Sequence, residues 1–146
     1  MNGLVSRGLF DKEVANLSRL AGLRGWRIHS TDFPILDIQF ERVGKPTLRL
    51  RMIATDWNDM PPSFELLTPD GSYLPPVVSK LLPGGVLNNT PQRNTKRPFI
   101  CMIGSKEYHT HENHLNDPWD NYRNKDGISL VYILSQIWNA WLLTSL

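Results

Sequence analysis

Cysteine is almost absent from the sequence, and so is a strong excess of charge of either sign. Cys101 is the only cysteine among 146 residues, which excludes a disulfide within the chain and a zinc site built from several cysteines. A single free thiol is typical of the reducing cytosol, so we expect a cytoplasmic protein. The net charge of +2, without a dense run of lysine and arginine, argues against a nucleic-acid partner.

The sequence also lacks an apolar run long enough to cross a membrane. The longest, Ile128 to Leu143, is interrupted by polar residues and is shorter than the roughly 20 apolar residues that a membrane helix needs. Met1 to Arg7 has neither the charged start nor the apolar centre of a signal peptide. We therefore expect no membrane partner, and a single globular domain over residues 1–146.

The spacing of apolar residues predicts helices at the two ends of the chain. Phe10 to Leu23 has apolar residues at helical spacing, and Gly22 and Gly25 stand where this helix should stop. Near the other end, Asp126 is a good N-cap for a helix over Ile128 to Leu143. Apolar residues cover most of the circumference of that helix, so we expect it to lie in the core against a sheet.

Strands are predicted between these helices. Ile35 to Val43 and Leu48 to Ile53 both alternate, and the Gly44-Lys45-Pro46 turn between them predicts a hairpin. Ser63 to Leu67 reads as a third strand, followed by a turn at Thr68 to Gly71. Helix, antiparallel strands, loop and helix in this order predict an α+β fold with a β-meander.

Two further features of the chain allow more than one interpretation. Arg49 and Arg51 share a strand face, which we expect to be a solvated sheet surface, the alternative being a site for an acidic partner. Pro75 to Pro98 is rich in proline, glycine and asparagine and cannot hold a long regular element. A long irregular loop that leads into a candidate site is more often functional than idle.

Reactive side chains are concentrated between Arg97 and Trp119. This stretch contains Cys101, two glutamates and three of the four histidines: Glu107, Glu112, His109, His111 and His114. Phe99 to Ile103 reads as a short buried strand and Gly104-Ser105 as a turn. If Glu107 to His111 is extended, Glu107, His109 and His111 share one face, which the turn could fold back over the thiol.

The order of these features resembles the ubiquitin-conjugating enzymes. Trp57 to Pro62 is similar to their aromatic and double-proline element, Phe99 to Cys101 to their catalytic strand, and Ile128 to Leu143 to the helix behind it. The resemblance implies the ubiquitin-conjugating-enzyme-like version of the α+β fold, with one N-terminal helix, a long active-site loop and one core helix. The two C-terminal helices of the eukaryotic enzymes do not follow, so we expect a C-terminally truncated form.

A closer resemblance is to the bacterial Cys-Glu-His-His family, in Cys101, Glu107, His109 and either His111 or His114. That family was labelled a predicted metal-binding domain and is associated with bacterial ubiquitin-like conjugation operons. The first label implies a metal site, and the second implies a cytoplasmic conjugating enzyme in an antiphage pathway. Its partners would be a ubiquitin-like protein, an adenylating activating enzyme and a protein substrate. The His-Pro-Asn triplet of conjugating enzymes is absent, and Asn88, Asn89 and Asn94 are the candidates for its asparagine.

The conjugating interpretation gives each reactive residue a role. Cys101 would carry the modifier as a thioester, with a histidine, Lys106 or Arg97 favouring the thiolate. Proton transfer to or from the attacking amine would fall to Glu107, His109, His111 or His114. The oxyanion would be stabilised by Asn94, Asn89 or a backbone N–H, and Asp117 would support the site from behind. This interpretation requires no cofactor.

Two other interpretations use the same residues. Cys101, Glu107 and two of the three histidines could hold zinc, as a binding protein or a metallohydrolase, although three ligands on one strand would be about 6.5–7 Å apart per step. An inactive interaction module of the same fold would have a merely buried cysteine. For His29, which stands alone in the sequence, we expect an ordinary strand-edge position.

Overall fold

The computed structural model describes residues 3–75, 85–88, 92, 94–123, 125 and 127–144. Two residues proposed from the sequence, Asn89 and Asp126, lie outside these ranges, as does much of the Pro75–Pro98 loop. Helices and a four-stranded antiparallel sheet make up most of the part of the chain that the structure describes. The α+β class with a meander sheet and a C-terminal helix is therefore confirmed.

The N-terminal segment forms two helices, where the sequence predicted a single helix from Phe10 to Leu23. Helix α1 spans Gly3–Val14 and α2 spans Leu17–Arg24. The chain leaves helical geometry at Asn16, with φ −104° and ψ 12°, and asparagine disfavours helix interiors because its side chain competes for the backbone. Gly25 ends α2 in the left-handed conformation, at φ 73°, as its position predicted.

Four strands form the sheet in the order β1-β2-β3-β4. The strands are β1 (Trp26–Ser30), β2 (Ile35–Arg42), β3 (Lys45–Ile53) and β4 (Ser63–Leu67). The β2–β3 hairpin and the third predicted strand, at Ser63 to Leu67, are confirmed. The first strand was missed, because it is defined by its pairing with β2.

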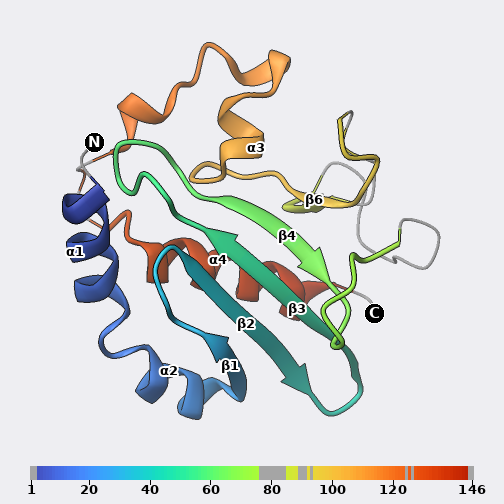
Figure 1. Ribbon diagram of the computed structural model, residues 1–146. Coiled ribbons are helices and arrows are strands. Elements are labelled where there is room, and N and C mark those ends of the chain that lie inside the picture. The colour runs from blue at the N-terminus through green and yellow to red at the C-terminus, as the bar shows by residue number, and fades with distance from the viewer. Residues whose placement is uncertain are drawn as a thin grey trace.

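One face of the sheet forms the core with the C-terminal helix. Leu36, Ile38 and Phe40 alternate along β2 and are fully buried. Helix α4 (Leu130–Leu143) lies behind this face in Figure 1, and the Trp141 ring packs 5.6 Å from the Phe40 ring. The helix is buried as expected. Its N-cap is Ser129, whose hydroxyl accepts a hydrogen bond from the Tyr132 N–H at 3.0 Å.

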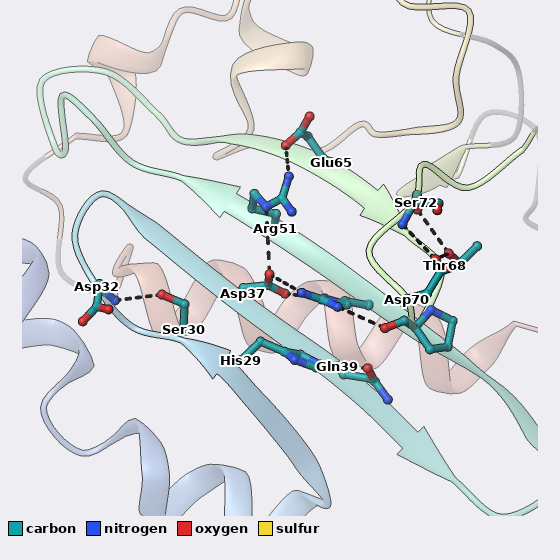
Figure 2. Close-up of polar contacts among 12 residues, drawn as sticks. His29, Ser30, Asp32, Asp37, Gln39, Arg51, Glu65, Thr68, Asp70 and Ser72 are labelled. Atoms are coloured by element: carbon teal, nitrogen blue, oxygen red, sulfur yellow. Dashed lines mark hydrogen bonds and ion pairs between the residues drawn. The ribbon is translucent and has the colours of Figure 1, made fainter.

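The opposite face of the sheet carries charged side chains that pair with one another (Figure 2). Arg49 donates two hydrogen bonds to the carboxylate of Asp37, at 2.9 and 2.8 Å. Arg51 donates to Glu65 at 3.0 Å. On the face that we expected to be a solvated surface, both arginines therefore pair with acids of their own sheet. His29 sits on the edge strand and bonds Gln39 at 2.9 Å, in agreement with its expected place.

A second, two-stranded sheet carries the candidate site. Strands β5 (Leu87–Asn88) and β6 (Phe99–Ile100) pair antiparallel beside the β4 edge. Figure 1 shows β6 and α3 (Lys106–His109) on the far side of β4 from the N-terminal helices. None of the helices that the structure describes is long and apolar enough to span a bilayer.

Candidate functional site

Cys101 lies directly after β6, at the point where the chain turns out of the small sheet. The Cys101 N–H donates to the Val86 carbonyl at 2.8 Å. Leu87 and Ile100, which pair across the sheet, are buried in the core. The thiol is free and partly exposed. The expected position of Cys101, beside the end of the Pro75–Pro98 loop, is confirmed for the part of that loop that the structure describes.

A tight turn and a short helix follow the cysteine, in place of the extended segment expected from Glu107 to His111. Gly104 adopts φ 101°, where L side chains are strained. Ser105 then caps α3, because its hydroxyl accepts the Tyr108 N–H at 3.2 Å. Strand β6 is also shorter than predicted, since it ends at Ile100. Glu107, His109 and His111 therefore do not share the face of a strand.

Glu107 places a carboxyl group against the start of β4. Its Oε1 accepts the Phe64 N–H at 2.8 Å, whereas its Oε2 is buried and has no hydrogen-bond partner. Burial raises the pKa of Glu107 to about 7, against the opposing effect of the Phe64 N–H. This carboxyl therefore exchanges its proton near neutral pH, which suits a general acid or base.

The thiol of Cys101 is protonated at rest. Burial raises its pKa, and the negative charge of Glu107 raises it further. The expectation that Lys106, Arg97 or a histidine would favour the thiolate is wrong, because the charge that acts on the thiol is the Glu107 carboxylate. The two groups are close enough for their charges to interact. The Glu107 carboxylate is therefore a nearby acceptor for a proton that leaves the thiol.

His109 is held by the backbone at both ring nitrogens. Its Nε2 accepts the Gly104 N–H at 3.0 Å, which leaves Nδ1 to donate to the Asp117 carbonyl at 2.9 Å. Burial lowers its pKa, so the ring is neutral and its only lone pair is engaged. His109 thus fixes the turn at Gly104 to the segment at Asp117.

The Asp117 carboxylate accepts hydrogen bonds from two phenol hydroxyl groups. Tyr108 and Tyr122 each donate to its carboxylate, at 2.7 Å. These two bonds lower the pKa of Asp117. The bond to Asp117, with burial and neighbouring charges that include Cys101, raises the pKa of Tyr108 to about 12. Asp117 therefore holds Tyr108 and Tyr122, and its supporting role in catalysis stays a prediction. Tyr108 is a neighbour of the thiol that the sequence interpretation left out.

The other two candidate histidines lie at the surface of the same segment. The His114 ring stacks on the Tyr108 ring, with centroids 4.0 Å apart. His111 caps the short 3-10 helix at Glu112–His114, where its Nδ1 accepts the Asn113 N–H at 3.1 Å. Both rings are partly exposed, and their catalytic roles stay predictions.

Of the candidate asparagines that the structure describes, Asn88 lies in the small sheet beside the strand that leads to the cysteine. Asn88 faces Phe99 across the small sheet, and the next pair toward Cys101, Leu87 with Ile100, points into the core. Because side chains alternate along a strand, Asn88 and Cys101 project to the other side together. Asn94 lies in an exposed turn where its N–H bonds the Gln92 side chain.

The predicted zinc ligands do not converge. Across the described residues there is no group of three or more histidine, cysteine, aspartate or glutamate side chains that could hold a metal ion. His109 has both nitrogens bonded to the backbone, and Glu107 faces β4. The geometry gives the zinc alternative no support.

A pocket of about 110 Å³ lies next to Glu107, on the side of β4. Its walls come from β4, from the turn before β6 and from α3; the lining residues are Phe64, Glu65, Leu66, Tyr73, Gln92, Thr95, Arg97, Pro98, Phe99 and Glu107. Glu107 is thus shared between the pocket and the surroundings of the thiol.

Comparison with known proteins finds a family model that matches this half of the chain. Residues 84–143 match the Y4jH-like family, described as the Y4jH family. The uncharacterized protein y4jH of Sinorhizobium fredii (strain NBRC 101917 / NGR234) is 42% identical over 41 residues, which are 28% of this chain and 20% of that protein. The match thus spans about a fifth of the length of this relative. The segment that is similar to the Y4jH family model, residues 84–143, carries Cys101, α3 and α4.

Proposed function

We propose that Cys101 carries a ubiquitin-like protein as a thioester, in a bacterial conjugation pathway of the cytoplasm. The modifier comes from an adenylating activating enzyme and is passed to an amine of a target protein. The observation that carries this proposal is a partly exposed thiol on which the charge of the Glu107 carboxyl acts. That carboxyl has one unpartnered buried oxygen, and its pKa is about 7.

The arrangement of the elements also supports the proposal. The thiol follows a short strand at the edge of a meander sheet, and α4 packs behind its turn, because Ile133 lies against Gly104. Trp57 to Pro62 leads into β4, which meets α3 through the Lys106 N–H and the Pro62 carbonyl at 2.8 Å. This is the order of parts that resembles the conjugating enzymes.

Two acyl transfers make up the proposed reaction. In the first, the Cys101 sulfur attacks the thioester carbonyl on the activating enzyme, loses its proton, and releases the thiol of that enzyme. In the second, a target amine attacks the Cys101 thioester, an amide bond forms, and the C–S bond breaks to regenerate the Cys101 thiol. The amine must lose a proton during the second step.

Glu107 is the group best suited to take that proton. It is near the thiol, it titrates near neutral pH, and its Oε2 lacks a partner. His109 is poorly suited, because its Nε2 already accepts the Gly104 N–H. We therefore assign the base to Glu107, and to His109 the role of holding the turn in place.

Asn88 is our candidate for the oxyanion donor. Its side chain projects to the same side of the small sheet as Cys101, and its amide could donate to the oxygen of a tetrahedral intermediate. Asn88→Ala should slow transfer roughly 10²–10³-fold if it supplies that hydrogen bond. Asn139→Ala, an exposed change on α4, is the matched control.

The proposal is tested by reconstitution with the modifier, the activating enzyme and ATP. We expect an adduct on the wild-type protein that a reducing agent cleaves, and none on Cys101→Ala. Cys101→Ser and Cys101→Lys should trap an ester and an amide, which reducing agent leaves intact. If the activating enzyme charges its modifier and Cys101→Ala conjugates at the wild-type rate, the carrier role is wrong.

The role of Glu107 is tested by measuring how fast the protein that carries the modifier as a thioester transfers it to an amine. Glu107→Gln should charge normally but discharge roughly 10²–10⁴-fold more slowly. The wild-type rate should rise with pH through about 7, as Glu107 loses its proton, and the variant should lack this inflection. Equal discharge rates and equal pH profiles would remove Glu107 from the mechanism.

A further inference from the structure

The pocket beside Glu107 has charges of both signs in its walls. Glu107 contributes a carboxyl group. Arg97 contributes a guanidinium group that stacks on the Tyr73 ring, with its central carbon 3.6 Å from the ring centroid. Glu65, the other acid of the pocket, already binds Arg51 at 3.0 Å. Among the lining residues that the structure describes, Glu107 and Arg97 are therefore the two charged groups left for a ligand.

The walls of this pocket are held by hydrogen bonds. The Gln92 side chain accepts the N–H groups of Asn94 and Thr95, at 2.9 and 2.8 Å. The Gln92 N–H donates to the Arg97 carbonyl at 2.8 Å. The Phe64 N–H fixes the Glu107 carboxyl. The two charged groups thus come from separate segments, α3 and the turn before β6, and each is held in place.

A ligand with a single charge fits these walls poorly. An alkylammonium ion would pair with Glu107 but would meet the guanidinium of Arg97 in the same small space. A carboxylate alone would pair with Arg97 but would meet the Glu107 and Glu65 carboxyl groups. A molecule with both charges satisfies both walls, and aromatic side chains of Phe64, Tyr73 and Phe99 suit a short carbon chain between them.

We infer that this pocket binds a small zwitterion, an amine and a carboxylate on one short carbon chain, with the ammonium on Glu107 and the carboxylate on Arg97. A planar guanidinium offers two parallel N–H donors to a carboxylate. The volume of about 110 Å³ equals that of about four water molecules in the liquid. This limits the ligand to the size of a small amino acid.

The inference goes beyond the thioester role and does not rest on it. Cys101 is not among the described residues that line the pocket. Binding is therefore measured on the protein alone, without the modifier, the activating enzyme or ATP. Failure of the reconstitution assay leaves the binding result standing, and failure of binding leaves the adduct on Cys101 unaffected.

The test is a titration with glycine, β-alanine and γ-aminobutyrate. Binding is measured by calorimetry and by the backbone amide NMR shifts of Phe64, Thr95 and Phe99. Propylamine and propionate are the ligands with one charge. We expect the best zwitterion to bind at least tenfold more tightly than either of them, since each charge-assisted contact contributes about that factor. The series of chain lengths measures the separation of the two charged groups.

Two substitutions assign the two ends of the ligand. Glu107→Gln retains an oxygen for the Phe64 N–H and should weaken zwitterion binding at least tenfold, as should Arg97→Gln. The controls are Glu112→Gln and Arg19→Gln, exposed changes of the same charge, which should leave binding within twofold. The inference is overturned if no zwitterion binds at millimolar concentration, if propylamine or propionate binds as tightly, or if neither substitution weakens binding.

Discussion

Glu107 keeps a carboxyl group where its ionisation opposes folding. Its ordinary pKa of 4.5 rises to about 7, chiefly through burial. Because each unit of pKa corresponds to about 1.36 kcal/mol, the ionised group destabilises the folded state by about 3 kcal/mol above neutral pH. A residue with a purely structural role gains nothing from this arrangement. A carboxyl that must release and regain a proton near pH 7 does.

This cost predicts how Glu107→Gln changes stability with pH. Below pH 4.5 the carboxyl is protonated in both states, and the variant should match the wild type. As pH rises from 4.5 to about 7, the unfolded chain ionises first, so the wild type loses stability and the variant does not. At pH 8 the variant should melt roughly 6–12 °C higher. Melting curves at pH 4 and pH 8 measure the difference.

Glu112→Gln is the control for this experiment, because Glu112 lies in the same segment but is exposed. Its melting temperature should follow that of the wild type at both pH values. A Glu107→Gln variant that is no more stable than the wild type at pH 8 would show that the ionised carboxyl does not destabilise the folded state.

At the scale of single residues, the sequence predicted which side chains gather but not what each can do. Cys101, Glu107, His109 and Asp117 are neighbours as expected. Their roles depend on a few ångströms and on the direction of each lone pair. The sequence made His109 a candidate base, but both of its ring nitrogens are hydrogen-bonded to backbone groups. Glu107 is the better candidate, because one of its carboxyl oxygens has no hydrogen-bond partner.

Among the elements, the meander could be predicted because its burial pattern is local. Leu36, Ile38 and Phe40 alternate with polar residues, and all three are fully buried. Strand β1 could not be predicted in this way, since it depends on long-range pairing such as Trp26 with Phe40. Helix α3, at Lys106–His109, is too short to show a period. One local signal, Ser105 as an N-cap, favours a helix at this position. The alternation of Glu107, His109 and His111 favoured an extended segment instead.

The turn between Cys101 and α3 depends on Gly104. A side chain there would be strained at φ 101°, and its Cβ would meet Ile133 side-chain carbons at 3.0 Å. Gly104→Ala should therefore lower the free energy of unfolding by roughly 2–4 kcal/mol, the sum of the backbone strain and the overpacking. Urea denaturation measures this loss, and NMR of the His109 ring reports whether its bond to the Gly104 N–H survives.

Gly127→Ala separates the two contributions, because Gly127 has φ 89° but open space around its Cα. This control should lose only the backbone part, roughly 1–2 kcal/mol. If both variants lose the same amount, the contact with Ile133 does not constrain the turn, and α4 does not hold the site from behind.

Over the whole molecule, the two ends of the chain are tied together behind the site. Glu13 on α1 accepts the Leu130 N–H, in the first turn of α4, at 2.7 Å. Its other oxygen accepts the indole N–H of Trp57, which lies in the segment before β4. Trp57 in turn packs against Trp119, with ring centroids 5.6 Å apart, and the Trp119 ring lies 5.6 Å from that of His109. One carboxylate thus connects α1, α4 and the segment that supports the candidate site.

No pattern in the sequence pointed to this link, because its partners are 117 and 44 residues away from Glu13. The helix predicted over Phe10 to Leu23 would have placed Glu13 near its start. In the structure Glu13 instead lies near the C-terminal end of α1 and compensates the free N–H groups of another helix, α4.

Glu13→Ala should accordingly destabilise the whole fold. Two charge-assisted hydrogen bonds are lost and two part-buried donors are left unpaired, so we expect a loss of about 2–4 kcal/mol in urea denaturation. Glu13→Gln should lose a large part of this, because two N–H donors converge on the carboxylate and an amide has only one acceptor oxygen. Asp11→Asn, on an exposed position of the same helix, is the control and should change little. A Glu13→Gln variant as stable as the wild type would show that the two N–H groups find other acceptors, and that the ends of the chain are held together by apolar packing alone.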